Sequence, residues 1–177
     1  NISIGFAPDT DSSLSATLNI QPLNDRKNGT QSISLDGTGT TADATLNRSA
    51  VGFGSVPING TQTTTLEISN DGTAPLDITG SSITGTDSGA FSINGLGTPI
   101  LSSGTSTTFT VEANATGVTR GSLSTKLAIT TNDTTVTSSL GATAVEADID
   151  VTGSVGTSAF GPTRLGDTST ATFQVNN

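Results

Sequence analysis

Stretches of this 177-residue chain resemble one another at an almost constant distance along the sequence. Residues 53–61 (FGSVPINGT) match residues 160–168 (FGPTRLGDT) at an offset of 107, and the agreement continues to residue 177. Two further pairs of segments agree at offsets of 109 and 105, namely residues 14–20 with 123–129, and residues 41–46 with 146–151. Such a period indicates a repeated structural unit of about 105 residues.

The repeat predicts three parts in this chain. Residues 1–42 are the C-terminal part of one unit, residues 43–147 are a complete unit, and residues 148–177 are the N-terminal part of the next. Two organisations fit this division: a segment of a longer tandem array, or a subunit whose incomplete units are completed by neighbours in a fibre. In the second case the joined parts still lack the counterpart of residues 71–107.

Short runs of alternating apolar and polar residues predict β-strands with one buried face. The clearest runs lie within residues 66–68, 109–111, 123–129 and 136–140. Turn residues separate the runs at residues 70–72, 87–89, 94–95, 103–104 and 132–133. About seven short strands in a unit of about 105 residues predict an all-β fold of tandem immunoglobulin-like β-sandwich repeats. The hydrophobic content of 31% predicts a thin core.

The composition excludes most catalytic chemistry. Cys, Met, Trp, Tyr and His are absent, so the chain has no thiolate, no disulfide and no histidine base or ligand. Six Phe are the only aromatic residues, which argues against a ring-lined groove for sugars or bases. Only carboxylate pairs remain, such as Asp9 with Asp11, and no neighbouring groups tune them. We expect a non-enzymatic protein without catalytic or cofactor-binding residues.

The charge and hydropathy of the chain exclude two classes of partner. Its 6 basic and 15 acidic residues give a net charge of -9, which repels the phosphate backbone of nucleic acid. No apolar run approaches the roughly 18 residues that span a bilayer, so we expect no membrane span in these residues.

The complete unit resembles the Ig-like repeats of the ASPM/SPD-2/hydin (ASH) superfamily, and most of all bacterial choice-of-anchor D repeats. The resemblance is carried by residues 51–56 (VGFGSV), 60–61 (GT), 68–76 (ISNDGTAPL) and 91–93 (FSI). The preceding part adds residues 6–8 (FAP) and 35–39 (LDGTG). The resemblance implies Ig-like sandwiches in a secreted bacterial protein.

Several marked residues are interpreted as structural. Phe53 and Phe160 each precede a glycine at the start of equivalent strands, where a ring fills the end of the core and the glycine allows close backbone approach. Phe91 and Phe109 are likewise assigned to the core. Residues 70–72 (NDG) predict a hairpin turn in which Gly72 takes a positive φ.

Two kinds of surface site fit the sequence. Calcium is the one metal the residues allow, through turn carboxylates, and its candidate ligands are Asp9, Asp11, Asp148 and Asp150. Six Asn-x-Ser/Thr triplets are candidate N-glycosylation sites, at Asn1, Asn28, Asn47, Asn59, Asn114 and Asn132. Simple solvation of an acidic surface is favoured over a calcium site, and chance in so Ser/Thr-rich a chain predicts about three of the six triplets.

These observations favour an extracellular or cell-surface structural protein. Small sandwiches repeated end to end build a stalk, a fibre or an adhesin shaft that serves cell adhesion, and an open strand edge lets such a chain polymerise into a filament or fibril by strand pairing. The alternative is a carbohydrate- or protein-binding module of a larger secreted protein. The expected partners are neighbouring repeats or other copies of the chain, and a surface glycan or protein ligand.

The connections between units predict a rod. Residues 40–45 and 145–150 contain no Pro and no long Gly/Ser run. Connections of this composition and length are short and stiff rather than flexible tethers.

Overall fold

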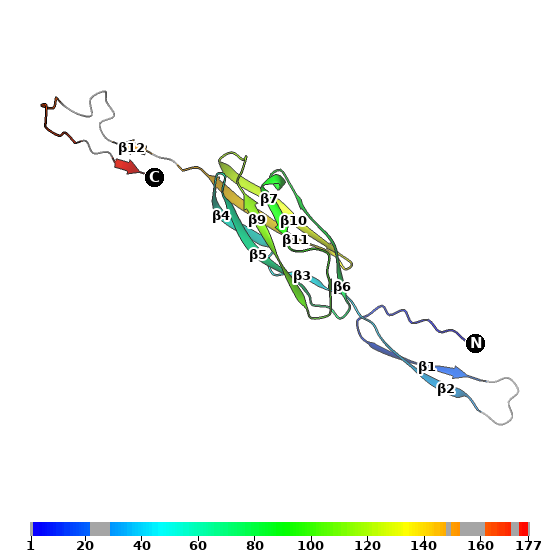
Figure 1. Ribbon diagram of the computed structural model, residues 1–177. Coiled ribbons are helices and arrows are strands. Elements are labelled where there is room, and N and C mark those ends of the chain that lie inside the picture. Colours follow the sequence, from blue (N-terminus) through cyan, green and yellow to red (C-terminus); the bar gives the residue numbers. More distant parts are fainter. Residues whose placement is uncertain (1, 22–28, 148–149, 153–161, 171–173, 177) are drawn as a thin grey trace.

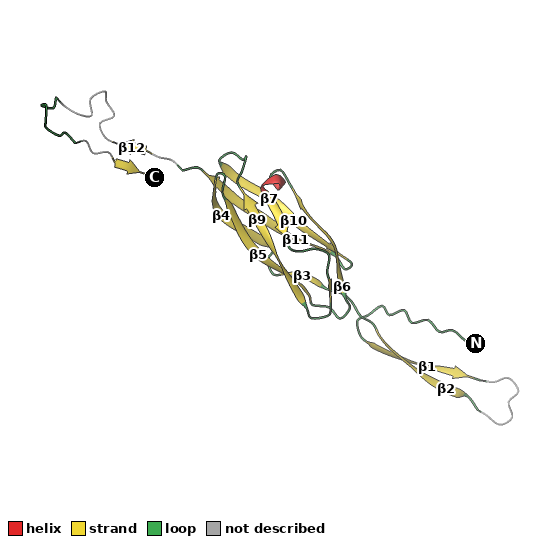
Figure 2. Ribbon diagram, viewed as in Figure 1, coloured by secondary structure: helices red, strands yellow, loops and turns green. Residues whose placement is uncertain are grey.

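The computed structural model describes residues 2–21, 29–147, 150–152, 162–170 and 174–176. These residues form strands and connections, with one 3-10 turn, η1 (Ser88–Ala90), and no α-helix (Figure 2). A two-sheet sandwich occupies the centre, with a two-stranded ribbon at one end and a short ladder at the other (Figure 1). The chain is therefore all-β, as its alternating pattern predicts, and its central part is an Ig-like sandwich.

Two sheets face each other in this sandwich. The larger has the order β4 (Ala50–Pro57), β11 (Thr135–Val145), β10 (Gly121–Thr131), β6 (Leu76–Thr84) and β8 (Ile100–Leu101). In it β4 runs parallel to β11, and the other pairs are antiparallel. The smaller sheet is antiparallel and has the order β3 (Ala44–Leu46), β5 (Thr61–Asn70), β9 (Ser106–Asn114) and β7 (Phe91–Asn94).

The core lies between the sheets and is built from the predicted alternation. Leu66 and Ile68 on β5 are fully buried, as are Leu127 and Ile129 on β10. The strands are nine rather than about seven. The first two strands of the sandwich belong to different sheets, because β3 pairs with β5 and β4 pairs with β11, and β8 has only two residues.

The Phe-Gly motif forms a bulge at the edge of the larger sheet. The register of β4 against β11 shifts between Gly52 and Ser55, and Gly54 between them has a φ of 69°. The Phe53 ring packs against Phe91 with centroids 5.8 Å apart, so its assignment to the core is confirmed. Phe91 and Phe109 are buried as predicted. Phe160 lies outside the described residues.

The predicted role of Gly54 was therefore wrong in its mechanism. A Cβ at Gly54 would meet nothing within 4 Å, so close approach does not require this glycine. Glycine is required at this position because the backbone has a positive φ, which residues with a side chain adopt only at a cost in free energy.

The segment at residues 70–72 is not a hairpin. β5 belongs to the smaller sheet and β6 to the larger one, so the chain crosses between the sheets here. Asn70 is fully buried, and its Oδ1 accepts a hydrogen bond from the Gly72 N–H, as expected of an Asn turn. Gly72 has no positive φ, and a Cβ there would collide with the Thr41 carbonyl oxygen and with the Asp43 nitrogen. The predicted hairpin and left-handed glycine are corrected to a sheet-to-sheet connection with close backbone packing.

The outer strands pair in registers related to those of the sandwich. β1 (Ser13–Ile20) pairs with β2 (Gln31–Thr38), so that Leu14 faces Gly37, and this matches Leu123 facing Ala142 when the offsets 109 and 105 are applied. β12 (Asp150–Thr152) pairs with β13 (Gln174–Asn176). Its Asp150–Asn176 pair matches the Thr45–Ser69 pair of β3 with β5 at offsets of 105 and 107.

Candidate functional site

A carboxylate joins the N-terminal ribbon to the sandwich. Asp11 precedes β1, and its two oxygens each lie 2.9 Å from the Thr73 hydroxyl, which belongs to the loop between β5 and β6. The Thr41 hydroxyl donates to Asp11 Oδ2 at 3.1 Å. Asp11 therefore accepts hydrogen bonds from the connecting segment and from the sandwich at once, and we call this set of three residues the Asp11 clasp.

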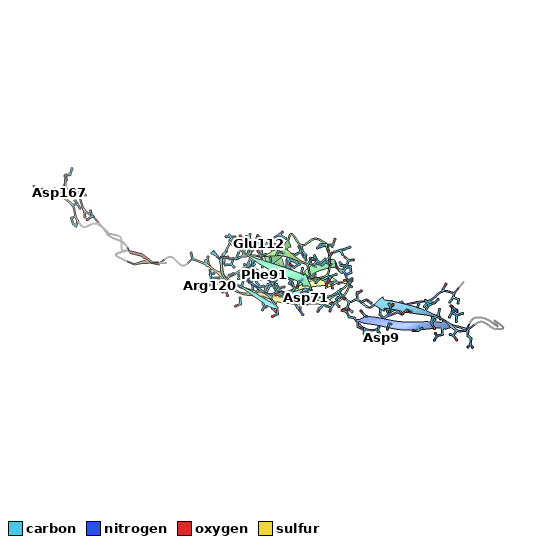
Figure 3. The ribbon with its side chains drawn as sticks, turned by 90° about the horizontal axis from the view of Figure 1, so that it is seen from below. Asp9, Asp71, Phe91, Glu112, Arg120 and Asp167 are labelled. Carbon is cyan, nitrogen blue, oxygen red and sulfur yellow. The ribbon has the colours of Figure 1, made fainter. Side chains whose placement is uncertain are left out.

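Backbone hydrogen bonds reinforce the clasp on both sides. Thr73 and Ala74 donate their N–H groups to the Thr41 carbonyl, at 2.7 and 2.8 Å. On the other side the Gly39 N–H donates to the Ser12 carbonyl at 2.9 Å. The connecting segment is thus hydrogen-bonded to the ribbon at one point and to the sandwich at another. In Figure 3, Asp9 and Asp71 mark the two sides of this junction.

The structure gives the calcium candidates different surroundings. Asp9 is exposed, and Asp9 and Asp11 lie in a connection before β1 rather than on a strand. Asp148 lies outside the described residues, and Asp150 belongs to β12. Among the residues that the structure describes, no three Asp or Glu side chains gather as a metal site would need. The oxygens of Asp11 face threonine hydroxyls instead.

A second feature is an apolar face on the N-terminal ribbon. Seven large apolar side chains are exposed among the described residues, and five of them belong to residues 2–33: Ile2, Ile4, Phe6, Leu14 and Ile33. A groove of about 560 Å³ runs between residues 4–6 and the ribbon. The Phe6 ring lies against Gly37, where a Cβ would stand only 2.6 Å from the ring. We call these five side chains the open face.

The glycosylation candidates within the described residues are Asn47, Asn59, Asn114 and Asn132, whereas Asn1 and Asn28 lie outside them. Asn59 is exposed in a turn with a φ of 64°. Asn132 is exposed, but its amide already donates to the Pro75 carbonyl at 3.2 Å and accepts from the Asp77 N–H. Asn47 and Asn114 each accept a backbone N–H through the side-chain oxygen.

Sequence reasoning missed both structural features. The clasp joins residues 30 and 62 positions apart, and threonine is so frequent in this chain that no spacing marks Thr41 or Thr73. The open face has a detectable signal, because the apolar residues Ile2, Ile4 and Phe6 alternate with small residues ahead of the ribbon.

No helix in the described part of the chain is long and apolar enough to cross a bilayer.

The sequence matches one family of known domains. The family model described as HYDIN/CFA65/VesB-like, Ig-like domain matches residues 42–143, which is more than half of the chain. The chain belongs to this family. The residues that match the HYDIN/CFA65/VesB-like family model are those of the two-sheet sandwich. The match confirms the ASH-type Ig-like domain that the sequence resembles.

Several solved structures are similar to this chain at low sequence identity. The ASH / PapD-like domain 7 of human CEP192 is 15% identical, with a TM-score of 0.46 over 59% of this chain and 87% of that domain. A Porphyromonas gingivalis protein of unknown function is 16% identical, with a TM-score of 0.49 over 77% of this chain and 68% of that one. The Vibrio cholerae VesB protease is 17% identical, with a TM-score of 0.40 over 56% of this chain and 31% of the protease. No curated protein sequence matches the chain.

Proposed function

We propose that this chain is a non-enzymatic part of an extracellular structural protein, in which Ig-like units follow one another end to end in a stalk, fibre or adhesin shaft. An Ig-like domain of this family fits a structural or binding module. The Asp11 clasp favours the structural role over the binding role, because a carboxylate and two hydroxyls hold one part of the chain against the next.

The strand registers support the end-to-end arrangement. The ribbon of β1 and β2 pairs like β10 and β11, and the ladder of β12 and β13 pairs like β3 and β5. The ribbon and the ladder lie at opposite ends of the sandwich (Figure 1). Each end of the complete unit thus continues into strands that belong to another unit of the same kind, and this continuation builds length.

The proposal is tested by measuring how firmly the clasp holds the ribbon. The chain has no cysteine, so Thr17→Cys on β1 and Thr65→Cys on β5 give one spin-label pair that spans the junction. We expect a narrow distance distribution in double electron–electron resonance. Asp11→Ala should broaden it, because the Thr41 and Thr73 hydroxyls lose their common acceptor.

Asp9→Ala is the matched control, since it removes an exposed carboxylate two positions away. The control should leave the distribution unchanged. A distribution that is already broad in the parent chain would refute the rod. Equal broadening by both substitutions would instead assign the effect to net charge rather than to the clasp.

A further inference from the structure

Two Asn-Gly pairs lie within the described residues, Asn59-Gly60 and Asn94-Gly95. In such a pair the glycine nitrogen can attack the Cγ atom of the asparagine side chain, since glycine has no side chain to hinder the approach. The N–Cγ bond forms as the nitrogen gives its proton to solvent, the Cγ–Nδ2 bond breaks, and ammonia leaves. Water then opens the succinimide ring at either of its two carbonyl carbons, which gives isoaspartate or aspartate.

The turn at Asn59 holds its reactive groups in place. The Gly60 N–H donates to the Pro57 carbonyl at 2.7 Å, and the Gly60 carbonyl accepts from the Ala115 N–H at 3.0 Å. The Asn59 N–H donates to the Ala115 carbonyl at 3.1 Å. These hydrogen bonds must open before the Gly60 nitrogen can turn toward the asparagine side chain, so the fold protects Asn59.

The surroundings of Asn94 are different. Asn94 is the last residue of β7, at the edge of the smaller sheet, and both Asn94 and Gly95 are exposed. In the described structure the Gly95 N–H makes no hydrogen bond, and a Cβ at Gly95 would meet nothing within 4 Å. The Asn94 amide nitrogen donates to the Ser92 hydroxyl at 3.5 Å, a long contact. The attacking nitrogen and the leaving group are both free to move.

The remaining asparagines that precede a small residue resemble Asn59 rather than Asn94. In each case the N–H group of the following residue is already donated. These N–H groups belong to Asp71, Ala115 and Asp133, and they donate to the Asp43 carbonyl, the Gly60 carbonyl and the Thr131 hydroxyl. Among the described asparagines that precede Gly, Ala or Asp, Asn94 is therefore the one whose attacking nitrogen is free.

We propose that Asn94 is a site of spontaneous modification, where the folded chain converts asparagine to isoaspartate and aspartate through a succinimide. Isoaspartate adds one carbon to the backbone where β7 ends, two residues before the buried Leu96. The product also places a carboxylate on the face that carries Glu112, because Glu112 pairs with Ser92, two residues before Asn94. The conversion therefore weakens the last pair of β7, Asn94 with Thr110.

Peptide mapping of the full chain by mass spectrometry tests the proposal after incubation at mildly alkaline pH. Cleavage after Phe and Leu places the two Asn-Gly pairs in separate peptides, residues 54–66 and 92–96. Both pairs follow an isoleucine, so their local sequences are matched. We expect conversion at Asn94 to be at least about 10-fold faster than at Asn59, with both isoaspartate and aspartate as products.

The same incubation in urea that unfolds the chain is the control. The difference between Asn94 and Asn59 should disappear there, because the hydrogen bonds that protect Asn59 are lost. Equal rates in the folded chain, or aspartate as the sole product at Asn94, would overturn the proposal. A difference that persists in urea would also overturn it, since local sequence rather than the fold would then select the site.

Discussion

Asn70 offers the sharpest test of how this fold is held together. Its side chain is fully buried at the point where the chain leaves β5 and crosses to the other sheet. The Nδ2 group donates to the Ala74 and Leu101 carbonyl oxygens at 2.8 and 3.0 Å. The Oδ1 atom accepts from the Gly72 and Asp43 N–H groups at 3.1 and 3.3 Å. Asn70→Asp keeps this acceptor and turns the two-hydrogen donor into a second oxygen.

The cost of Asn70→Asp follows from those contacts. Two donated hydrogen bonds disappear, each with a net contribution of about 1 kcal/mol, and two carbonyl oxygens are left facing a buried carboxylate. An uncompensated buried charge raises the expected loss in the free energy of unfolding to about 3–5 kcal/mol at pH 8. Burial and the facing carbonyls raise the pKa of the new carboxyl above its unfolded value.

The sign of the pH dependence follows from that raised pKa. The folded state binds the proton more tightly than the unfolded state, so the penalty is largest at high pH and falls as the pH drops through the folded pKa. The protonated acid also regains one donor. We expect the difference from the parent chain to shrink by about 2 kcal/mol between pH 8 and pH 5.

Urea unfolding at both pH values measures this difference. Asn132→Asp is the control, because exposed Asn132 makes the same type of contacts with the Asp77 N–H and the Pro75 carbonyl. The control should lose about 1 kcal/mol or less at either pH. A variant at Asn70 that stays within about 1 kcal/mol of the parent chain, with no pH dependence, would refute the assignment of Asn70 as the buried link.

Three further predictions concern single sites. Ser138 is buried on β11 and, in the described structure, its Oγ has no hydrogen-bond partner. Ser138→Ala should therefore stabilise the chain by about 1 kcal/mol in urea unfolding, whereas Ser139→Ala, at an exposed position, should not. Destabilisation by Ser138→Ala would contradict this prediction. Gly54→Ala should destabilise by about 1–2 kcal/mol because of the φ of 69°, whereas Gly52→Ala, in open space on the same strand, should cost less than half of that; equal costs would remove the bulge argument. Calcium or EDTA should leave the thermal midpoint unchanged, because the Asp11 oxygens already face two hydroxyls; a rise of several degrees with calcium would place an ion in this chain.

The strands were predictable and their placement was not. Alternation at Leu66 and Ile68 needs only the period of a pleated strand, and both side chains are buried as predicted. The Asn-Asp-Gly segment after them signals a change of direction, but local turn chemistry does not determine which sheet the next strand joins. The buried position of Asn70 depends on Leu101, 31 residues away, and Gly72 is required by the packed backbone of residues 41–43. Contacts of this range leave no local pattern in a single sequence.

The two ends of the complete unit use corresponding positions with different chemistry. At one end Asp11 accepts from Thr41. Their counterparts at the other end, by the offsets 109 and 105, are Arg120 and Glu146. Gly121 pairs with Ala144, so Arg120, just before β10, and Glu146, just after β11, lie at the same end of the β10–β11 ladder. The backbone of the unit thus sets which positions meet at a junction, and the side chains set what can form there. A carboxylate between hydroxyls needs no opposite charge, whereas the attraction between exposed, oppositely charged side chains such as Arg120 and Glu146 is weakened by salt. We therefore expect junctions of unequal stiffness along one chain.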